Sequence, residues 1–157
     1  MTGNSSFHIV LIEPEIPPNT GNIARLCGAT GSVLHLVGQL GFTIDDKQLK
    51  RAGLDYWDAV DIRRWDRLET LKAEYPDGRF WYTSKKAFKS YTEVRYRPGD
   101  FFVFGKETLG LPDQLIADNA DKSIRIPILT PTVRSLNLST SAGIVLYEAL
   151  RQSGRLT

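Results

Sequence analysis

Apolar residues along the chain follow two spacings, one typical of buried strands and one typical of amphipathic helices. Short β-branched and aromatic runs predict strands at residues 7–12, 33–37, 59–63, 80–83, 101–104 and 123–128. The segments between them predict helices at about residues 19–30, 45–52, 67–75, 112–119 and 139–152. The last of these carries apolar residues three and four positions apart, as in an amphipathic helix, and the one at 45–52 is short and charged. This alternation predicts an α/β fold, a mostly parallel sheet with helices on both faces.

Proline and small polar residues indicate where two of these helices begin. Residues 13–19 contain three prolines, and we expect a loop there because proline is excluded from the interior of a helix. Asn19 or Thr20 would then cap the helix that follows, and Ser139 would cap the last helix.

Length and composition suit one domain. The 157 residues are 41% hydrophobic and 24% charged, which is ordinary for a globular protein. We expect residues 1–6 to be a frayed polar tail and residues 7–157 to form the domain. No apolar run is long enough to span a membrane, and the first residues do not resemble a signal peptide. Cys27 is the only cysteine, which fits a reducing compartment, and we expect a cytoplasmic protein without membrane association.

Charge alone does not indicate a nucleic-acid partner, because a net charge of +2 and a pI of about 8.7 are mild. Basic residues nevertheless gather in three places, at residues 47–51, 63–67 and 85–89, with acidic residues between them. Each cluster is either part of an RNA-binding surface or an ordinary solvated surface of mixed charge.

Three loops follow predicted strands, at residues 83–86, 105–111 and 127–137. Ligands of parallel sheets bind beyond the carboxyl ends of the strands. These loops are therefore the expected site before any family is considered.

A segment rich in proline and small polar residues, EPEIPPNTGNIAR, leads from the first strand into the first helix. The free backbone N–H groups of a helix start favour an anion or a polar ribose, and Arg25 lies about one turn further on. The alternative is a capped helix followed by a surface arginine. The segment is not a P-loop, because it lacks the pattern G-x-x-x-x-G-K.

Two further segments combine an adaptable backbone with polar side chains. In FGKETLGLP, residues 104–112, Glu107 stands between two glycines, where its carboxylate could bind ligand hydroxyls or fix the loop. IPI at 126–128 is followed by RSLNLS at 134–139, which could cap a helix or present backbone groups to an adenine or a ribose. An ordinary strand-to-helix turn and an ordinary helix cap remain open for the two segments.

Other reactive residue types form no pattern of their own. His8 and His35 lie in apolar strands without the ligand spacing of a metal site, so we expect them to be structural and expect no metal. Cys27 lies on the apolar face of its helix and is expected to be an inert core thiol. The three tryptophans are expected in the core or in an interface: Trp57, Trp65 and Trp81.

Together, the three segments resemble the signature motifs of the SPOUT superfamily of RNA methyltransferases. N-x-G-N-x-x-R stands at residues 19–25, F-G-x-E-x-x-G-L at 104–111, and I-P-I with S-L-N-L-S at 126–128 and 135–139. The order and separation of the motifs make the resemblance specific, and it covers the chain from Phe7 to about Gly154. The chain is most similar to the TrmL (YibK-like) group, to which the block D-D-K-x-x-K-R-A-G-L-D-Y at 45–56 also points.

The resemblance implies a single-domain SPOUT fold with a deep trefoil knot at its C-terminal end. It implies S-adenosyl-L-methionine (SAM) bound in the knot, and a homodimer with each active site at the subunit interface. The activity it implies is methylation of the 2′-hydroxyl of the wobble nucleotide, cytidine or uridine 34, in leucine tRNAs. The residues that match the cofactor-binding loops of the family are Thr83, Ser84, Gly105, Glu107, Gly110, Ile126, Ser135, Leu136 and Asn137.

The resemblance also suggests catalytic and RNA-binding residues. Arg25 matches an arginine proposed as a base in related enzymes, but a guanidinium stays protonated at physiological pH. We expect Arg25 to hold the adjoining phosphate and orient the hydroxyl, while a water, a phosphate oxygen or Tyr147 accepts the proton. Asn22, Glu107 and Asn137 are expected to shape the loops rather than to react. The residues expected to bind the anticodon stem-loop are Asn19, Asn22, Lys47, Lys50, Arg51 and Arg134.

Three other interpretations fit less well. A nicotinamide-dependent oxidoreductase is disfavoured because no G-x-G-x-x-G follows the first strand. A non-catalytic RNA-binding protein with the SPOUT fold is disfavoured by the three intact motifs. A methyltransferase of another tRNA or of rRNA is disfavoured only by the resemblance over residues 45–56, and the chain departs from the group at its polar N-terminus, Lys106, Leu109 and Trp57.

Overall fold

Strands and helices alternate in the computed structural model, which describes residues 6–43, 47, 51 and 57–157. The strands are β1 (His8–Ile12), β2 (Val33–Val37), β3 (Ile62–Trp65), β4 (Phe80–Thr83), β5 (Lys89–Ser90), β6 (Phe101–Phe104) and β7 (Ser123–Arg125). The helices are α1 (Pro17–Thr30), α3 (Leu68–Glu74), α4 (Asp113–Asp118) and α5 (Leu138–Gln152), with short 3-10 helices η2 (Trp57–Ala59) and η3 (Ala120–Lys122).

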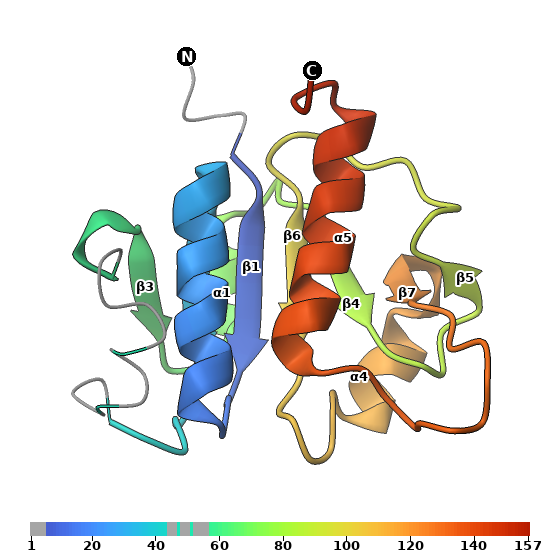
Figure 1. Ribbon diagram of the computed structural model, residues 1–157, viewed down its shortest axis with the longest axis horizontal. Coiled ribbons are helices and arrows are strands. Elements are labelled where there is room, and N and C mark those ends of the chain that lie inside the picture. Colours follow the sequence, from blue (N-terminus) through green and yellow to red (C-terminus); the bar gives the residue numbers. More distant parts are fainter. Residues whose placement is uncertain (1–5, 44–46, 48–50, 52–56) are drawn as a thin grey trace.

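The strands form one sheet in the order β3-β2-β1-β6-β4-β7-β5 (Figure 1). Every pairing among these strands is parallel. The central strands β1 and β6 pair from His8 with Phe101 to Leu11 with Phe104. Because parallel strands end at one edge of the sheet, the loops that follow the adjacent strands β6, β4 and β7 lie next to one another.

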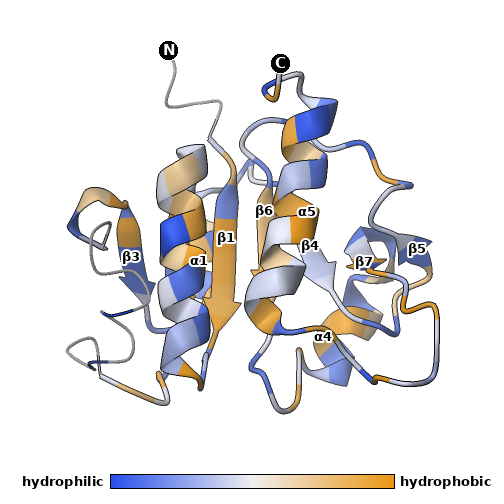
Figure 2. Ribbon diagram, viewed as in Figure 1, coloured by the Kyte–Doolittle hydropathy of each residue, from blue (hydrophilic) through white to orange (hydrophobic). Residues whose placement is uncertain are grey.

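Alternate side chains of the sheet point into two apolar cores, as the two-residue period of a strand requires. Ile9 and Leu11 pack on the face covered by α1 and α5, which lie side by side (Figure 1). Val10 packs on the opposite face with Leu71 of α3 and Ile116 of α4. Figure 2 shows β1 as largely hydrophobic, whereas α1 alternates between hydrophobic and hydrophilic residues. The predicted α/β fold with helices on both faces is confirmed, and the tryptophans pack in or against these cores as expected.

The first helix begins earlier than the prolines suggested. α1 starts at Pro17 with Ile16 as its N-cap residue and without a side-chain cap, so the prediction that Asn19 or Thr20 caps it was wrong. Proline is tolerated in the first turn, because the N–H groups there have no acceptor within the helix and the fixed φ is already helical. Asn19 and Thr20 are buried instead.

Several other boundaries differ from the prediction. β3 begins at Ile62 rather than at residue 59, because Trp57–Ala59 form a 3-10 turn. β7 ends at Arg125, shortly before Pro127, which has no N–H for a strand ladder. β5 was not predicted, because two polar residues carry no periodic signal.

Two of the predictions fall largely outside the described residues. The helix expected at 45–52 lies there apart from Lys47 and Arg51, and so do residues 1–5 of the expected tail. The knot stays a prediction. None of the helices in the described part of the chain is long and apolar enough to cross a membrane.

The two histidines form a hydrogen-bonded pair in which His35 is buried and His8 is partly buried, and they are structural, as expected. Trp65 Nε1 donates to Nδ1 of His35 over 3.0 Å, so the ring proton of His35 is on Nε2, which lies 2.9 Å from Nδ1 of His8. Burial lowers the pKa of His35 to about 3 and that of His8 to about 4, and both rings are neutral near pH 7. Burial raises the pKa of the Cys27 thiol to about 12, which makes it the inert core thiol that we expected.

Candidate active site

A pocket of about 660 Å³ opens where β4, β6 and β7 end. Small-molecule sites in proteins typically measure roughly 300–1,000 Å³. The three predicted loops, the third of which includes Arg134, form the wall of the pocket together with Asn19 at the start of α1. Its lining includes all nine predicted cofactor residues: Thr83, Ser84, Gly105, Glu107, Gly110, Ile126, Ser135, Leu136 and Asn137.

Glu107 is the centre of a hydrogen-bond network that joins the three motif segments. Its carboxylate accepts hydrogen bonds from the backbone N–H groups of Glu15, over 2.8 Å, and Ile16, over 3.0 Å. It also accepts one from Asn19 Nδ2 over 3.2 Å, and Asn19 Oδ1 accepts from Asn137 Nδ2 over 3.0 Å. This Glu107–Asn19–Asn137 network satisfies backbone donors in front of α1 and places a negative charge near the positive end of that helix. Of the two roles left open for Glu107, the structure shows the one that fixes the loop.

Asn137 caps α5, and the prediction that Ser139 caps it was wrong. The Oδ1 atom of Asn137 accepts from the backbone N–H groups of Ser139, over 2.8 Å, and Thr140, over 3.3 Å. The hydroxyl of Ser139 also donates to this oxygen over 2.6 Å. One amide side chain therefore caps α5 with its oxygen and reaches α1 with its nitrogen.

The loop after β6 folds back on itself and is tied to the segment before α1. The N–H of Gly110 donates to the carbonyl of Lys106 over 2.8 Å, and Gly110 has a φ of +69°. A Cβ on Gly105 would lie 2.1 Å from the carbonyl carbon of Gly110, so only glycine allows this close approach. The hydroxyl and the N–H of Thr108 bind the Glu15 carboxylate over 2.8 and 3.1 Å, and these bonds lower the pKa of Glu15.

The side chains of the loop after β4 are also held by the protein. Thr83 Oγ1 donates to the carbonyl of Val103 over 2.9 Å, and Ser84 Oγ accepts from the N–H of Lys86 over 3.1 Å. Lys86 belongs to the predicted loop at 83–86, whereas Asp113 was not expected at the site; both line the pocket, and Lys86 Nζ lies 2.8 Å from Asp113 Oδ1. Because this ion pair joins the loop after β4 to the first residue of α4, no local sequence pattern could have revealed it.

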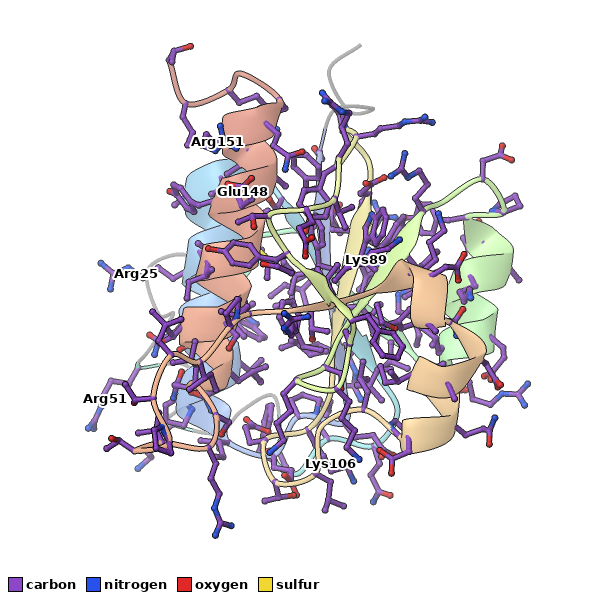
Figure 3. The ribbon with its side chains drawn as sticks, turned by 90° about the vertical axis from the view of Figure 1, so that its right-hand side faces the viewer. Arg25, Arg51, Lys89, Lys106, Glu148 and Arg151 are labelled. Carbon is purple, nitrogen blue, oxygen red and sulfur yellow. The ribbon has the colours of Figure 1, made fainter. Side chains whose placement is uncertain are left out.

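The predicted catalytic and RNA-binding residues on α1 and α5, apart from Asn19, do not line this pocket. Asn22 and Arg25 are exposed on α1, and Tyr147 on α5 is 43% exposed. Figure 3 shows the Arg25 side chain extending from α1 away from the sheet. These residues lie on the outer surface of the α1–α5 pair, rather than inside the pocket of their own chain.

The other predicted RNA-binding cations are dispersed. Arg134 is exposed at the pocket, whereas Lys47 and Arg51 are exposed in the segment that precedes η2, and Figure 3 shows Arg51 pointing outward. Lys50 lies outside the described residues. Within residues 6–43, 47, 51 and 57–157, no group of three or more histidine, cysteine, aspartate or glutamate side chains could hold a metal ion.

Comparison with known proteins identifies the class that this fold and pocket define. Residues 6–147 match the SpoU rRNA Methylase family. The AdoMet-bound rRNA methyltransferase from Sinorhizobium meliloti superimposes with a TM-score of 0.82 at 27% identity, over 94% of this chain and 57% of that chain. The fold is therefore that of the SPOUT methyltransferases, as the motifs predicted. The chain belongs to the SpoU family and is an RNA methyltransferase.

Two relatives are similar over nearly their whole length. The tRNA (cytidine(34)-2′-O)-methyltransferase of Saccharophagus degradans is 50% identical over 152 residues, which are 94% of this chain and 96% of that protein. A structure solved for insight into the 2-OH methylation of C/U34 on tRNA superimposes with a TM-score of 0.90 at 43% identity. That superposition covers 97% of this chain and 99% of the other.

Proposed function

We propose that the protein is a SAM-dependent 2′-O-ribose methyltransferase of the wobble nucleotide, cytidine or uridine 34, in leucine tRNAs. The observation that carries this proposal is the Glu107–Asn19–Asn137 network, which gathers the three motif segments around one pocket. The activity of the Saccharophagus degradans relative and the structural work on C/U34 methylation support the substrate. The choice of leucine tRNAs rests on the resemblance of the motifs alone.

The residues around the pocket fit SAM as the cofactor. Ile126 and Leu136 offer apolar surface to an adenine, while Ser135 and the backbone of the glycine-containing loop offer hydrogen bonds to a ribose. The carboxylate of Glu107 is already engaged by three donors of the protein, so we assign it to the loop rather than to the ligand. When bound, SAM supplies a methyl group activated by a positively charged sulfur.

The side chains of the protein would position the ribose and receive its proton. The 2′-oxygen bonds to the methyl carbon as the carbon–sulfur bond breaks, and the sulfide that leaves is neutral. Arg25 would hold the adjoining phosphate, and the hydroxyl proton would pass to water, to a phosphate oxygen or to Tyr147. Since the sulfide that leaves is neutral, no oxyanion hole is needed. Correct positioning would supply most of the rate enhancement, and it can lower the barrier by about 7–11 kcal/mol.

We also propose that the active form is a homodimer with each active site at the subunit interface. Asn22, Arg25 and Tyr147 are exposed on the α1–α5 pair and outside the pocket of their own chain. A second copy packed on this surface would place its pocket next to these residues, which do not line the pocket of their own chain. The cytoplasmic location and the trefoil knot that the resemblance implies belong to the same proposal.

A methyltransferase of another tRNA or of rRNA is the second candidate, because the matched family is named for rRNA methylation. The protein would be incubated with labelled SAM and either total tRNA or ribosomal RNA, and the product mapped by nuclease digestion and mass spectrometry. We expect 2′-O-methylated cytidine or uridine in the tRNA sample only. A methyl group in rRNA would favour the second candidate, and SAM binding without transfer would contradict both enzymatic functions.

A further inference from the structure

An exposed phenylalanine stands among lysines beside the pocket. Phe88 is 83% exposed, although an aromatic ring of this size is usually largely buried. Lys85, Lys86 and Lys89 are exposed on either side of it in the sequence. Figure 3 places Lys89 on the side of the molecule that carries β5, away from α1. These four residues are termed the Phe88 patch below.

The patch borders an apolar hollow that adjoins the pocket. The hollow measures about 350 Å³ and lies between Phe88 and residues of α4, among them Ile116 and Ala117. Lys86 and Asp113 line both this hollow and the pocket described above. An RNA strand that enters the pocket could therefore continue directly over Phe88.

The backbone beneath the ring is fixed. Arg125 Nη1 donates to the carbonyl of Ala87 over 3.2 Å and also to the carbonyl of Phe88. Ala87 is buried, and its N–H donates to the carbonyl of Ser84 over 3.1 Å. The ring is thus held out to solvent on an ordered support, which lowers the entropy lost when a ligand binds.

The charges of the patch favour a polyanion over a protein partner. Lys86 is paired with Asp113 over 2.8 Å, whereas the ammonium group of Lys89 bonds to a neutral carbonyl, that of Asp121, over 3.2 Å. In the part of the chain that the structure describes, no carboxylate forms an ion pair with Lys89, so a phosphate is a suitable counterion for its charge. An exposed aromatic face next to such a cation is the arrangement with which proteins stack unpaired bases.

We infer that the Phe88 patch binds an unpaired nucleotide of the RNA substrate, distinct from the nucleotide that is methylated. Phe88 stacks on its base, and Lys89 contacts a phosphate. This inference rests on the proposed function, because it takes RNA as the substrate. The stacking is independent of base identity, since every base offers a π-face.

The test compares Phe88→Ala and Phe88→Trp in binding to an anticodon stem-loop RNA, with SAM affinity measured in parallel. Base stacking is worth about 1–3 kcal/mol, so Phe88→Ala should weaken RNA binding about tenfold, whereas Phe88→Trp should stay within about twofold of wild type. The affinity for SAM should not change. Wild-type protein should bind an RNA with an abasic site at the stacked position more weakly than the intact RNA. The abasic RNA should bind equally well to wild type and to Phe88→Ala.

Lys89→Gln should weaken RNA binding and reduce the slope of log Kd against log salt by about 0.7–0.9. The matched control is Arg97→Gln. Arg97 is an exposed cation that precedes the amino end of β6, whereas the pocket lies at the carboxyl ends of the strands. Arg97→Gln should leave the slope unchanged.

Unchanged RNA affinity of Phe88→Ala, in a preparation whose wild type binds and methylates the RNA, would overturn the inference while the proposed function stands. A change of oligomeric state at unchanged RNA affinity would assign Phe88 to a protein interface and overturn it as well. A wild-type protein that neither binds nor methylates the RNA would contradict the proposed function and this inference together.

Discussion

At the scale of single residues, the carboxylate of Glu107 acts as a hydrogen-bond acceptor that holds the loop after β6 against the start of α1. It faces three N–H donors from the segment around the start of α1, and each is satisfied by one of its two oxygens. A neutral amide would turn its own N–H group toward at least one of these donors. The position therefore requires an acid although the acid takes no part in the methyl transfer that we propose.

Glu107→Gln should lower the free energy of unfolding by about 1–3 kcal/mol, because a partly buried donor loses its acceptor. It should also weaken SAM binding, since the pocket wall shifts with the loop. Urea denaturation and calorimetric SAM titration would measure the two effects. Glu74→Gln, an exposed change at the end of α3, should alter stability by no more than about 0.5 kcal/mol. Equal stability of the two variants would contradict the structural role of Glu107.

The His8–His35 pair predicts how stability depends on pH. The pKa values of these rings lie at about 4 and about 3 in the folded protein, below the usual value of 6.5. Between pH 6.5 and 4 the unfolded chain therefore binds protons that the folded protein does not. Stability should fall with decreasing pH in this window, by up to about 1.4 kcal/mol per pH unit for each histidine.

Denaturant unfolding at several pH values and NMR of the imidazole nitrogens would measure this dependence. The NMR spectrum should show the ring proton of both histidines on Nε2, because each Nδ1 accepts a hydrogen bond. An imidazole that titrates near pH 6.5 in the folded protein would show that the pair is not buried as described.

At the scale of elements, the sequence predicted helix and strand bodies better than their ends. The apolar runs of β1, β4 and β6 coincide with the observed strands, because strands buried on both faces are continuously hydrophobic. The starts of α1 and α5 were misplaced, since the first depends on prolines in the first turn and the second on Asn137 rather than Ser139. Both starts depend on which of several neighbouring candidate residues takes the first helical positions, and the apolar pattern does not decide this.

For the site, too, the sequence predicted local segments better than the contacts between them. The three loops were predicted because glycine and polar residues after apolar strands are a local signal, and they line one pocket. The nine residues that the family resemblance implies for the cofactor line the same pocket, and their contact with the cofactor stays a prediction. The Asn19–Asn137 bond and the Lys86–Asp113 pair were not predicted, because nothing in either segment specifies its distant partner.

The cap of α5 gives a direct comparison of the two candidate residues. Asn137→Ala removes an acceptor of two helix N–H groups and the bond to Asn19, and should cost about 1–2 kcal/mol of stability. Asn137→Asp keeps the cap but loses the donor to Asn19, so it should be intermediate. Ser139→Ala should cost less than Asn137→Ala in thermal or urea unfolding. A larger effect of Ser139→Ala would contradict the cap described here.

At the scale of the whole molecule, one edge of a parallel sheet collects segments that are far apart in the chain. Asn19 and Asn137, separated by 118 positions, meet beside the pocket because α1 and α5 lie next to each other. The same arrangement leaves Arg25 and Tyr147 on the outer surface of this helix pair. The proposed dimer explains how a surface that is separate from the pocket could take part in catalysis.

Mixing two inactive variants tests that dimer. In the first variant, Arg25→Ala should remove the arginine that one chain contributes to the site of its partner. In the second variant, Leu136→Arg should block the pocket of the chain that carries it. Random reassociation of equal amounts should restore about a quarter of wild-type activity, since half of the dimers then contain one intact site. No recovery, with mixed dimers demonstrated by differential tagging, would mean that Arg25 acts within its own chain.

The central claim is that this pocket serves methyl transfer to the 2′-hydroxyl of nucleotide 34. The most direct measurement compares two otherwise identical leucine tRNAs, one with ribose and one with 2′-deoxyribose at position 34, each incubated with labelled SAM. We predict one methyl group per molecule on the first tRNA and none on the second. Equal incorporation into both would place the methyl group elsewhere and contradict the proposed function.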